Sequence, residues 1–213
     1  MFTGLIETIC TVKSVSRSAE TMLLTVDIGN LADDSKIGDS IAINGACLTI
    51  ARLEGSLVTF DLSAETLSKS TLGELKPSSQ VNVELAMKAT DRFGGHIVNG
   101  HIDGTAVIKA INRQAQFADI KFTAKAELLN QMVVKGSVAV DGISLTIASM
   151  DANGFSVAII PETLKKTTLG KTRVGDCVNI ETDIIVKTIK KQLESILPRR
   201  QTLTAEKLKQ LGF

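Results

Sequence analysis

Runs of apolar residues broken by polar ones predict short β-strands over most of the chain. In the first half, residues 22–28 form an apolar-rich run with partial alternation, and residues 40–51 are rich in β-branched and apolar side chains. Residues 57–62 and 81–87 add two further runs of strand length. Alternation and β-branched residues are typical of strands that bury one face. We therefore expect each half of the chain to be mainly β.

Turn-forming residues separate these runs. The segments EGS at 54–56 and ANG at 152–154 predict hairpin turns, because glycine and asparagine tolerate the positive φ angles that such turns need. The segment PETL at 161–164 predicts a short helix, with Pro161 in the first turn, where a missing N–H leaves no hydrogen bond unmade. Many short strands joined by turns favour a small closed barrel.

The pattern changes near the end of the chain. From residue 185 onward the apolar residues recur at helical spacing and form one stripe, made of Ile185, Val186, Ile189, Leu193, Ile196 and Leu197. We expect Pro198 to end or kink this helix, and residues 204–211 to form another short helical piece. The first half has no such tail, so the stripe packs either on a partner chain or back on its own barrel.

The chain also contains an internal duplication, which is the signature of a repeat architecture. The segment DSIAINGACLTI at 39–50 aligns with GSVAVDGISLTI at 136–147. At the same offset ETL recurs at 65–67 and 162–164, TLG recurs at 71–73 and 168–170, and VNVE at 81–84 meets VNIE at 178–181. Near the start of each half, GLIE at 4–7 resembles GHID at 100–103.

This duplication divides the chain into three parts. We expect an N-terminal barrel over residues 1–96, a C-terminal barrel over residues 97–184 and a helical tail over residues 185–213. The boundary should fall close to the segment GGH at 94–96, because paired glycines interrupt regular structure.

Composition argues against several classes of function. The 213 residues are 44% hydrophobic and 22% charged with a formal net charge of +1, so there is no basic footprint for nucleic acid or an anionic membrane. No apolar run approaches the roughly 20 residues that span a bilayer, and the first residues do not have the pattern of a secretory signal. Cys10, Cys47 and Cys177 are far apart, which predicts a cytoplasmic, reducing setting. The two histidines have no cysteine near them, so we expect no metal site.

Several motifs taken together resemble the riboflavin synthase family. They are MFTG at 1–4, NGACLT at 44–49, GGH at 94–96, GH at 100–101, DGISLT at 141–146, IPETL at 160–164 and TTLG at 167–170. The resemblance covers residues 1 to about 200, and it rests on the joint order and spacing of the motifs. It implies an all-β fold of two similar Greek-key barrels, with a C-terminal helix that builds a homotrimer.

The resemblance also implies a reaction. Two molecules of 6,7-dimethyl-8-ribityllumazine dismutate, and the transfer of a four-carbon unit from one to the other gives riboflavin and 5-amino-6-ribitylaminopyrimidinedione. The family does this without a metal or redox cofactor, between the N-terminal barrel of one subunit and the C-terminal barrel of its neighbour. An association with lumazine synthase is implied as well. A duplicated barrel suits this reaction, because donor and acceptor are the same molecule.

Cys47 and Ser144 occupy matching positions in the two halves and differ in chemistry. A free cysteine in a strand is often buried, but the resemblance places Cys47 in the pocket near the acceptor, either as a thiolate nucleophile or as a polar positioning group. Ser144 and Thr146 alternate on a strand and therefore share a face. That face is either solvated or, as the resemblance implies, part of the pocket, where Ser144 would polarise the substrate or carry a proton.

Two aspartates have no acidic counterpart in the first half. Asp141 aligns with Asn44, and Asp183 aligns with Ala86. Asp141 precedes a glycine, and Asp-Gly is a common turn pair, so its local context alone favours a turn. The resemblance implies instead that Asp141 and Asp183 form the acidic pair at the donor site.

Five further side chains each allow a structural and a functional interpretation. His96 and His101 can each serve as the general base that removes a proton from the C7 methyl group of the donor, since histidine titrates near neutral pH; the alternative is a structural histidine bonded to backbone. Lys135 is either a charge that protects a strand edge or, by resemblance, a group that reaches the substrate. Thr66, like its counterpart Thr163, is either a helix cap or a residue that binds ribityl hydroxyls.

The remaining expected substrate-binding residues form the edges of the two pockets by resemblance. Glycine lets the backbone approach a flat ring closely, and with so few aromatic residues the ring would be held by backbone amides and aliphatic walls. These residues are Gly4, Leu5, Ile6, Ser40, Leu48, Thr49, Asp61, Leu62, Ser63, Ala64, Glu65, Gly100, Ile102, Leu145, Ala158, Ile159, Ile160, Pro161 and Glu162.

Two other functions are compatible with parts of the pattern. A non-catalytic lumazine- or flavin-binding antenna protein of the same ancestry would keep the barrels but depart at pocket positions. We find no such departure at Cys47, Asp141, Ser144 or Asp183. A flavin-binding reductase would need a nucleotide-binding βαβ half, which the pattern does not contain.

Overall fold

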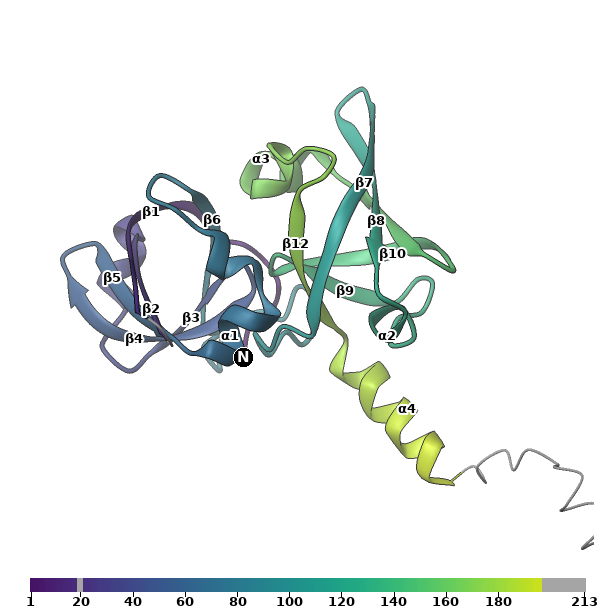
Figure 1. Ribbon diagram of the computed structural model, residues 1–213, viewed down its shortest axis with the longest axis horizontal. Coiled ribbons are helices and arrows are strands. Elements are labelled where there is room, and N and C mark those ends of the chain that lie inside the picture. Colours follow the sequence, from purple (N-terminus) through teal and green to yellow (C-terminus); the bar gives the residue numbers. More distant parts are fainter. Residues whose placement is uncertain (19–20, 197–213) are drawn as a thin grey trace, which may run out of the picture.

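The computed structural model describes residues 1–18 and 21–196, which form two closed β-barrels followed by a helix (Figure 1). The first barrel has the strand order β1-β2-β5-β4-β3-β6. Read around its ring, the second barrel repeats this order as β7-β8-β11-β10-β9-β12. The paired strands run antiparallel. The expected all-β fold of two similar barrels is therefore confirmed.

The two barrels consist of matching elements. The first contains β1 (Thr8–Arg17), β2 (Met22–Asp27), η1 (Gly29–Asp34), β3 (Ser40–Ile43), β4 (Ala46–Glu54), β5 (Leu57–Leu62), α1 (Ala64–Lys69), η2 (Thr71–Glu74) and β6 (Gln80–Leu85). The second contains β7 (Gly104–Gln114), β8 (Phe117–Ala124), α2 (Ala126–Leu129), β9 (Ser137–Val140), β10 (Ile143–Asp151), β11 (Gly154–Ile159), α3 (Pro161–Lys166), η3 (Thr168–Gly170) and β12 (Cys177–Thr182). The helix α4 (Ile184–Ile196) follows.

Alternation along the strands places one face of each in a barrel core. In β8, Ala118, Ile120 and Phe122 are buried while the residues between them are exposed, as the period-two geometry of a strand requires. Phe122 stacks on Phe155 of the paired strand β11, with ring centroids 5.0 Å apart. Each barrel therefore has its own apolar core, and its outer wall carries the alternate side chains.

Two expectations about the strands need correction. Residues 40–51 are not one strand but two, β3 and β4, because Asn44 and Gly45 take φ angles of 45° and 80° and form a tight hairpin turn. The sequence pattern also gave no indication of β1. Its register shifts between Val12 and Ser14, and most of its residues remain accessible, so the apolar alternation is weak and changes phase.

The expected turns and the expected helices within the described residues are present. Strands β4 and β5 are joined at residues 55–56, and β10 and β11 at residues 152–153. Helix α3 begins with Pro161 in its first turn. The helix expected from residue 185 onward is α4, whereas Pro198 and residues 204–211 lie outside the described part of the chain.

The barrels contact each other through pairs of equivalent residues, as a pseudo-twofold relation requires. Asn82 in β6 donates from Nδ2 to the carbonyl of Asp141 at 3.0 Å, and Asn179 in β12 donates in the same way to the carbonyl of Asn44 at 2.8 Å. Their Oδ1 atoms accept from the backbone N–H groups of residues 168 and 71, at 2.8 and 2.7 Å. Both asparagine side chains are fully buried, so the four hydrogen bonds tie the barrels together where water is excluded.

The contact is tightest where the two hairpin turns meet. A Cβ atom on Gly45 would lie 2.6 Å from the backbone nitrogen of Gly142. Each glycine also has a φ angle of 80°, so both close approach and backbone conformation require glycine here. The contact between the two turns therefore explains why a glycine is repeated at this position, as Gly45 in the first half and Gly142 in the second.

Helix α4 projects away from the second barrel (Figure 1). Its Lys187 binds Asp103 at 2.8 Å, but none of its residues is buried. The side chains of Ile185, Ile189, Leu193 and Ile196 are 52%, 55%, 50% and 74% exposed. Within the described part of the chain, these four side chains therefore do not pack on either barrel.

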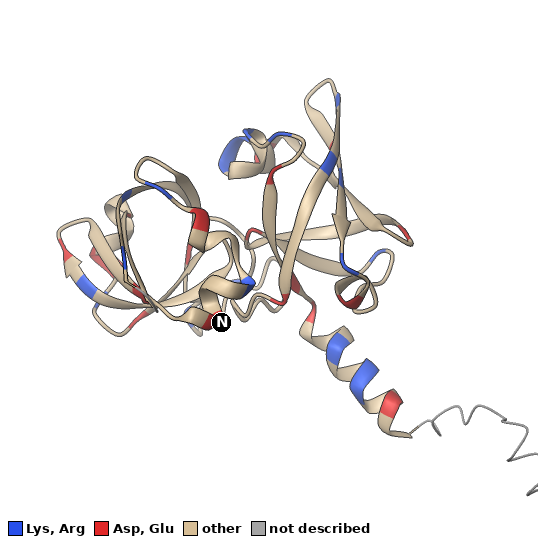
Figure 2. Ribbon diagram, in the orientation of Figure 1, with Lys and Arg blue, Asp and Glu red and all other residues tan. Residues whose placement is uncertain are grey.

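Charged residues are distributed over both barrels and along α4 (Figure 2). None of the helices in residues 1–18 and 21–196 has the length and apolar character needed to cross a membrane.

Candidate functional site

A cavity lies on the outer wall of the first barrel beside Cys47. In β4 the side chain of Leu48 is buried in the core, whereas Cys47 is half-buried and Thr49 exposed on the outer face. The cavity has a volume of about 450 Å³. It is lined by Ala46, Cys47, Glu65, Thr66, Lys69, Ser70, Gly100, His101 and Ile102.

Both halves of the sequence contribute to this cavity. It joins several of the expected site residues of the first barrel to the segment 100–102, which leads into the second barrel. Ala46, Lys69 and Ser70 also line it, although none of them was among the expected site residues. Lys69 has an identical counterpart in Lys166 of the second half. A comparison of the two repeats would therefore have identified this lysine.

Helix α1 brings Thr66 to the cavity without using it as a cap. The N-cap is Ser63, whose hydroxyl accepts from the backbone N–H of Thr66 at 3.2 Å. The two hydroxyl groups are 3.1 Å apart. In α3 the N-cap position is Ile160, which forms no side-chain cap, and Thr163 follows the proline in the same place as Thr66. Both threonine hydroxyls thus remain free of the capping role.

The matching surface of the second barrel is centred on Ser144. As in β4, the side chains of Ser144 and Thr146 lie on the outer face of β10, and Leu145 between them is buried. The Oγ atom of Ser144 lies 2.7 Å from Nδ1 of His96. Since His96 comes from the segment between the barrels, this pair also combines two distant parts of the sequence.

His96 is buried, with 7% of its surface exposed. Burial lowers its pKa below the ordinary value of 6.5, because the charged imidazolium loses its solvation. The negative charge of Asp183 acts in the opposite direction and raises the pKa of His96. The Nε2 atom of His96 has no hydrogen-bond partner among the described residues. A neutral histidine beside a hydroxyl can accept a proton.

Asp141 and Asp183 belong to different contact networks. Asp141 is buried in the turn between β9 and β10, where its Oδ1 accepts from the backbone N–H of Asn179 at 2.8 Å. Burial raises the pKa of Asp141 to about 7. Asp183 follows β12, and its Oδ1 accepts from the N–H of Ile185 at the start of α4, at 2.9 Å. Asp141 therefore lies at the barrel–barrel contact, whereas Asp183 influences His96.

Ser40 and Lys135 lie at the start of the strands that pair with these walls. Ser40 is opposite Thr49 in the β3–β4 ladder, and it also lines a separate hollow with Met1 and Lys88. Lys135 is exposed and has a φ angle of 69°, and its backbone N–H donates to the carbonyl of Ile147 at 2.9 Å. Its side chain is free to extend into solvent.

The other expected binding residues divide into two groups. Leu48, Leu62, Leu145 and Ile159 have side chains that are buried in the barrel cores, so only their backbone atoms are available at the walls. Exposed or half-buried positions on or beside the walls are occupied by Leu5, Ile6, Thr49, Asp61, Ser63, Ala64, Glu65, Thr66, Ile102, Thr146, Ala158, Ile160, Pro161, Glu162 and Thr163.

Two segments cross between the barrels and reach the walls. The carbonyl of Gly4 accepts from the backbone N–H of Ser144 at 2.8 Å, and the carbonyl of Gly100 accepts from that of Cys47 at 2.9 Å. Ile6 correspondingly packs against the core of the second barrel, whereas Ile102 packs against the core of the first. Each wall is therefore completed by the segment that leads into the other barrel.

Comparison with known proteins agrees with this geometry. The lumazine binding domain family matches the chain twice, at residues 3–86 and 99–183. The riboflavin synthase of Actinobacillus pleuropneumoniae is 40% identical over 215 residues, and that of Bacillus subtilis (strain 168) is 37% identical over 215 residues; both alignments cover 100% of each chain. The chain belongs to the riboflavin synthase family.

Other relatives extend this assignment. The riboflavin synthase of Chlamydia pneumoniae is 46% identical over 162 residues, which are 74% of this chain and 79% of the relative. Among solved structures, LumP complexed with 6,7-dimethyl-8-(1'-D-ribityl)lumazine has a TM-score of 0.78 at 21% identity, and LumP complexed with riboflavin has 0.79 at 23% identity. Each LumP alignment covers 85% of this chain and 99% of LumP. This likeness shows the shared duplicated-barrel fold.

Proposed function

We propose that the protein catalyses the riboflavin synthase reaction, in which one 6,7-dimethyl-8-ribityllumazine molecule passes a four-carbon unit to a second. The products are riboflavin and 5-amino-6-ribitylaminopyrimidinedione. Two substrate molecules together contain all the atoms of both products, so the conversion consumes no oxidant or reductant, and we assign no cofactor. The observation that carries the proposal is the pair of matched walls in a chain of this family, one presenting the thiol of Cys47 and the other the hydroxyl of Ser144.

The two walls have different chemistry at the equivalent position, which suits a reaction that needs a donor and an acceptor. The donor must lose a proton from its C7 methyl group. We assign this proton transfer to His96 and Ser144, whose Nδ1 and Oγ atoms lie 2.7 Å apart. Because burial lowers the pKa of His96, its imidazole is neutral near pH 7 and can accept the proton. Asp183 would stabilise the imidazolium that results, since its charge favours that form.

The remaining wall residues are assigned to binding. Thr66 and Thr163 would hold the ribityl hydroxyls, because their own hydroxyls are not used as helix caps. The backbone of the crossing glycines Gly4 and Gly100 would lie against the ring system, which a side chain there would obstruct. His101 is exposed beside Cys47 and would serve the acceptor side.

We further propose that residues 185–213 assemble a homotrimer, in which the first barrel of one subunit faces the second barrel of the next. An isolated helix of 13 residues is marginally stable in water, and half or more of the surface of Ile185, Ile189, Leu193 and Ile196 is exposed. Closed rotational symmetry would bury the same stripe from every subunit. Association with lumazine synthase rests on family likeness and is tested by co-elution. A cytoplasmic location accords with the three free cysteines.

A direct test uses the purified chain and the lumazine as the sole substrate. We expect riboflavin fluorescence to appear, with one molecule of the pyrimidinedione formed for each riboflavin. Binding of the lumazine without any riboflavin formation would refute the proposal and would favour the antenna protein instead.

A further inference from the structure

Two buried glutamates occupy matching positions in the last strand of each barrel. Glu84 lies in β6 and Glu181 in β12, and their exposed fractions are 4% and 1%. Neither forms an ion pair within residues 1–18 and 21–196. A carboxylate that is removed from water without a counter-charge needs strong hydrogen bonds to offset its lost solvation.

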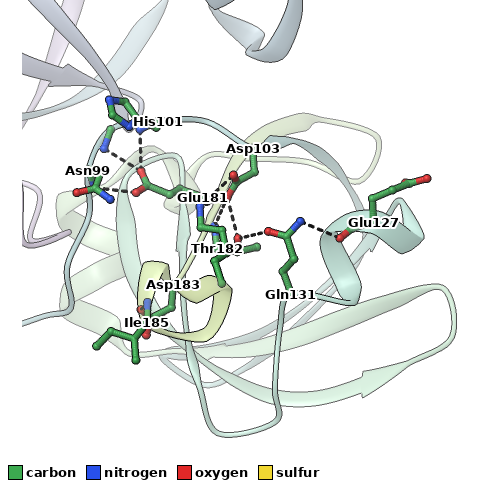
Figure 3. A network of polar contacts seen from close by, with 11 residues as sticks. Asn99, His101, Asp103, Glu127, Gln131, Glu181, Thr182, Asp183 and Ile185 are labelled. Carbon is green, nitrogen blue, oxygen red and sulfur yellow. Dashed lines mark hydrogen bonds and ion pairs between the residues drawn. The ribbon is translucent and has the colours of Figure 1, made fainter. Parts of the chain in front are cut away.

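The donors are backbone N–H groups of the crossing segments. Glu84 accepts from the N–H groups of Thr3 and Gly4 at 2.7 and 3.0 Å, and from the Thr3 hydroxyl at 2.7 Å. Glu181 accepts from the N–H groups of Asn99, Gly100 and His101 at 2.7, 2.9 and 3.1 Å. Figure 3 shows these bonds converging on Glu181. Each carboxylate therefore fixes the segment that carries the crossing glycine.

Those same glycines contact the reactive residues of the opposite wall. The carbonyl of Gly4, held by Glu84 of the first barrel, accepts from the N–H of Ser144 in the second barrel at 2.8 Å. The carbonyl of Thr3 accepts from the N–H of His96 at 3.1 Å. At the equivalent position of the other wall, the carbonyl of Gly100 accepts from the N–H of Cys47 at 2.9 Å.

The fit leaves little freedom for these contacts to shift. A Cβ atom on Gly4 would lie 2.6 Å from Cβ of Ser144, and one on Gly100 would overlap Cβ of Cys47. Because the segments and the walls are in direct contact, a displaced segment must displace the wall residue or lose its hydrogen bond.

We propose that Glu84 and Glu181 are positioning residues that act crosswise, each on the pocket of the other barrel. Glu84 holds Ser144 and His96 in place through residues 3 and 4. Glu181 holds Cys47 in place, together with His101, through residues 99–101. The catalytic importance of this arrangement rests on the function proposed above, whereas the crossed coupling itself does not.

The test uses Glu84→Gln and Glu181→Gln in the full-length chain, each serving as the control for the other. Glutamine keeps the volume of glutamate but replaces one accepting oxygen by an NH₂ group, which cannot accept from the backbone N–H that faces it. Two probes report on the two walls separately. One is the rate at which iodoacetamide alkylates Cys47, resolved from Cys10 and Cys177 by peptide mass analysis. The other is the pair of ring signals from the two histidines in an NMR spectrum.

We expect a crossed pattern. In Glu181→Gln the alkylation rate of Cys47 should rise about fivefold, consistent with the loss of a typical backbone hydrogen bond, and the His101 signal should move. In Glu84→Gln the His96 signal should move, while the alkylation of Cys47 and the His101 signal stay as in the parent. A same-barrel pattern, or identical responses from both variants, would overturn the proposal, because a purely structural loss does not distinguish the walls.

The kcat of the two variants distinguishes a failure of the crossed coupling from a failure of the proposed function. If both hold, each variant also loses about tenfold or more in kcat, as commonly follows from displacing a catalytic group. A crossed pattern with unchanged turnover would support the coupling and refute the catalytic roles of the wall residues. Should Glu84→Gln fail to fold, Thr3→Val removes the hydroxyl that donates to Glu84 and accepts from the backbone N–H of Leu5, and it keeps the backbone bonds to Glu84. It must then move the His96 signal and leave Cys47 unaffected, or the proposal is wrong.

Discussion

Replacing Asp141 by asparagine should stabilise the protein at neutral and alkaline pH. Asp141 is 6% exposed, and burial raises its pKa from 3.8 to about 7. At the matching turn in the first half, Asn44 accepts the equivalent backbone hydrogen bond from Asn82 at 2.7 Å without carrying a charge. Asp141→Asn therefore keeps the bond from Asn179 and removes the buried titratable group.

The magnitude follows from the difference in proton binding between the folded and unfolded states. An unfolded aspartate has a pKa of about 3.9, so between roughly pH 4 and pH 7 the folded protein holds a proton that the unfolded chain has released. The contribution of Asp141 to the free energy of unfolding is therefore largest below about pH 4, falls as the pH rises, and levels off above about pH 7. At about 1.4 kcal/mol per pKa unit, the total loss is about 4 kcal/mol.

Urea unfolding at a series of pH values from about 5 to 8, at one protein concentration, would measure this difference. The Asp141→Asn variant should become more stable than the parent as the pH rises. The matched variant Asn44→Asp should become less stable over the same range, because it places a second carboxyl in an equivalent buried turn. If the stability difference between Asp141→Asn and the parent does not change with pH, the buried carboxyl is not ionising as described.

Three further outcomes are expected. Cys47→Ala and Ser144→Ala should each reduce kcat by roughly tenfold or more in the riboflavin fluorescence assay; near-parental rates in both folded variants would contradict the assigned roles. A chain that ends after residue 186 should lose the trimer by light scattering and most of its activity, and a fully active trimer would show that the tail does not assemble the oligomer. Dialysis against EDTA should leave turnover unchanged, whereas metal-dependent recovery of lost activity would refute a cofactor-free reaction.

The fold was largely predictable because its strands are repeated and amphipathic. The duplication made two similar barrels a strong expectation, and the hairpin turns were visible as Gly and Asn. The division of residues 40–51 was missed because Asn44 and Gly45 interrupt a continuous apolar run with only two residues. Strand β1 was missed because its bulge changes the phase of the buried positions. The pattern of apolar and polar residues along the sequence does not show where the register of two paired strands changes.

The candidate site was predictable only in part, since its contacts join residues far apart in the sequence. Ser144 and His96 are 48 residues apart, and no local motif shows that their side chains meet. Glu84 and Asn82 were overlooked because a polar residue in a strand is normally solvated. Their identical counterparts in the second half were the available signal, because a repeated polar residue in an apolar strand points to a shared buried contact.

The crossing segments make the two repeats depend on each other. One repeat contains both a loop that completes a wall and a wall that needs such a loop, but within a repeat the two do not meet. Its contact surface is thus self-complementary, as in an isologous dimer. Two separate copies of one repeat would exchange these loops about a twofold axis. Joining the copies in one gene would have preserved that exchange while allowing Cys47 and Ser144 to diverge, which two identical chains cannot do.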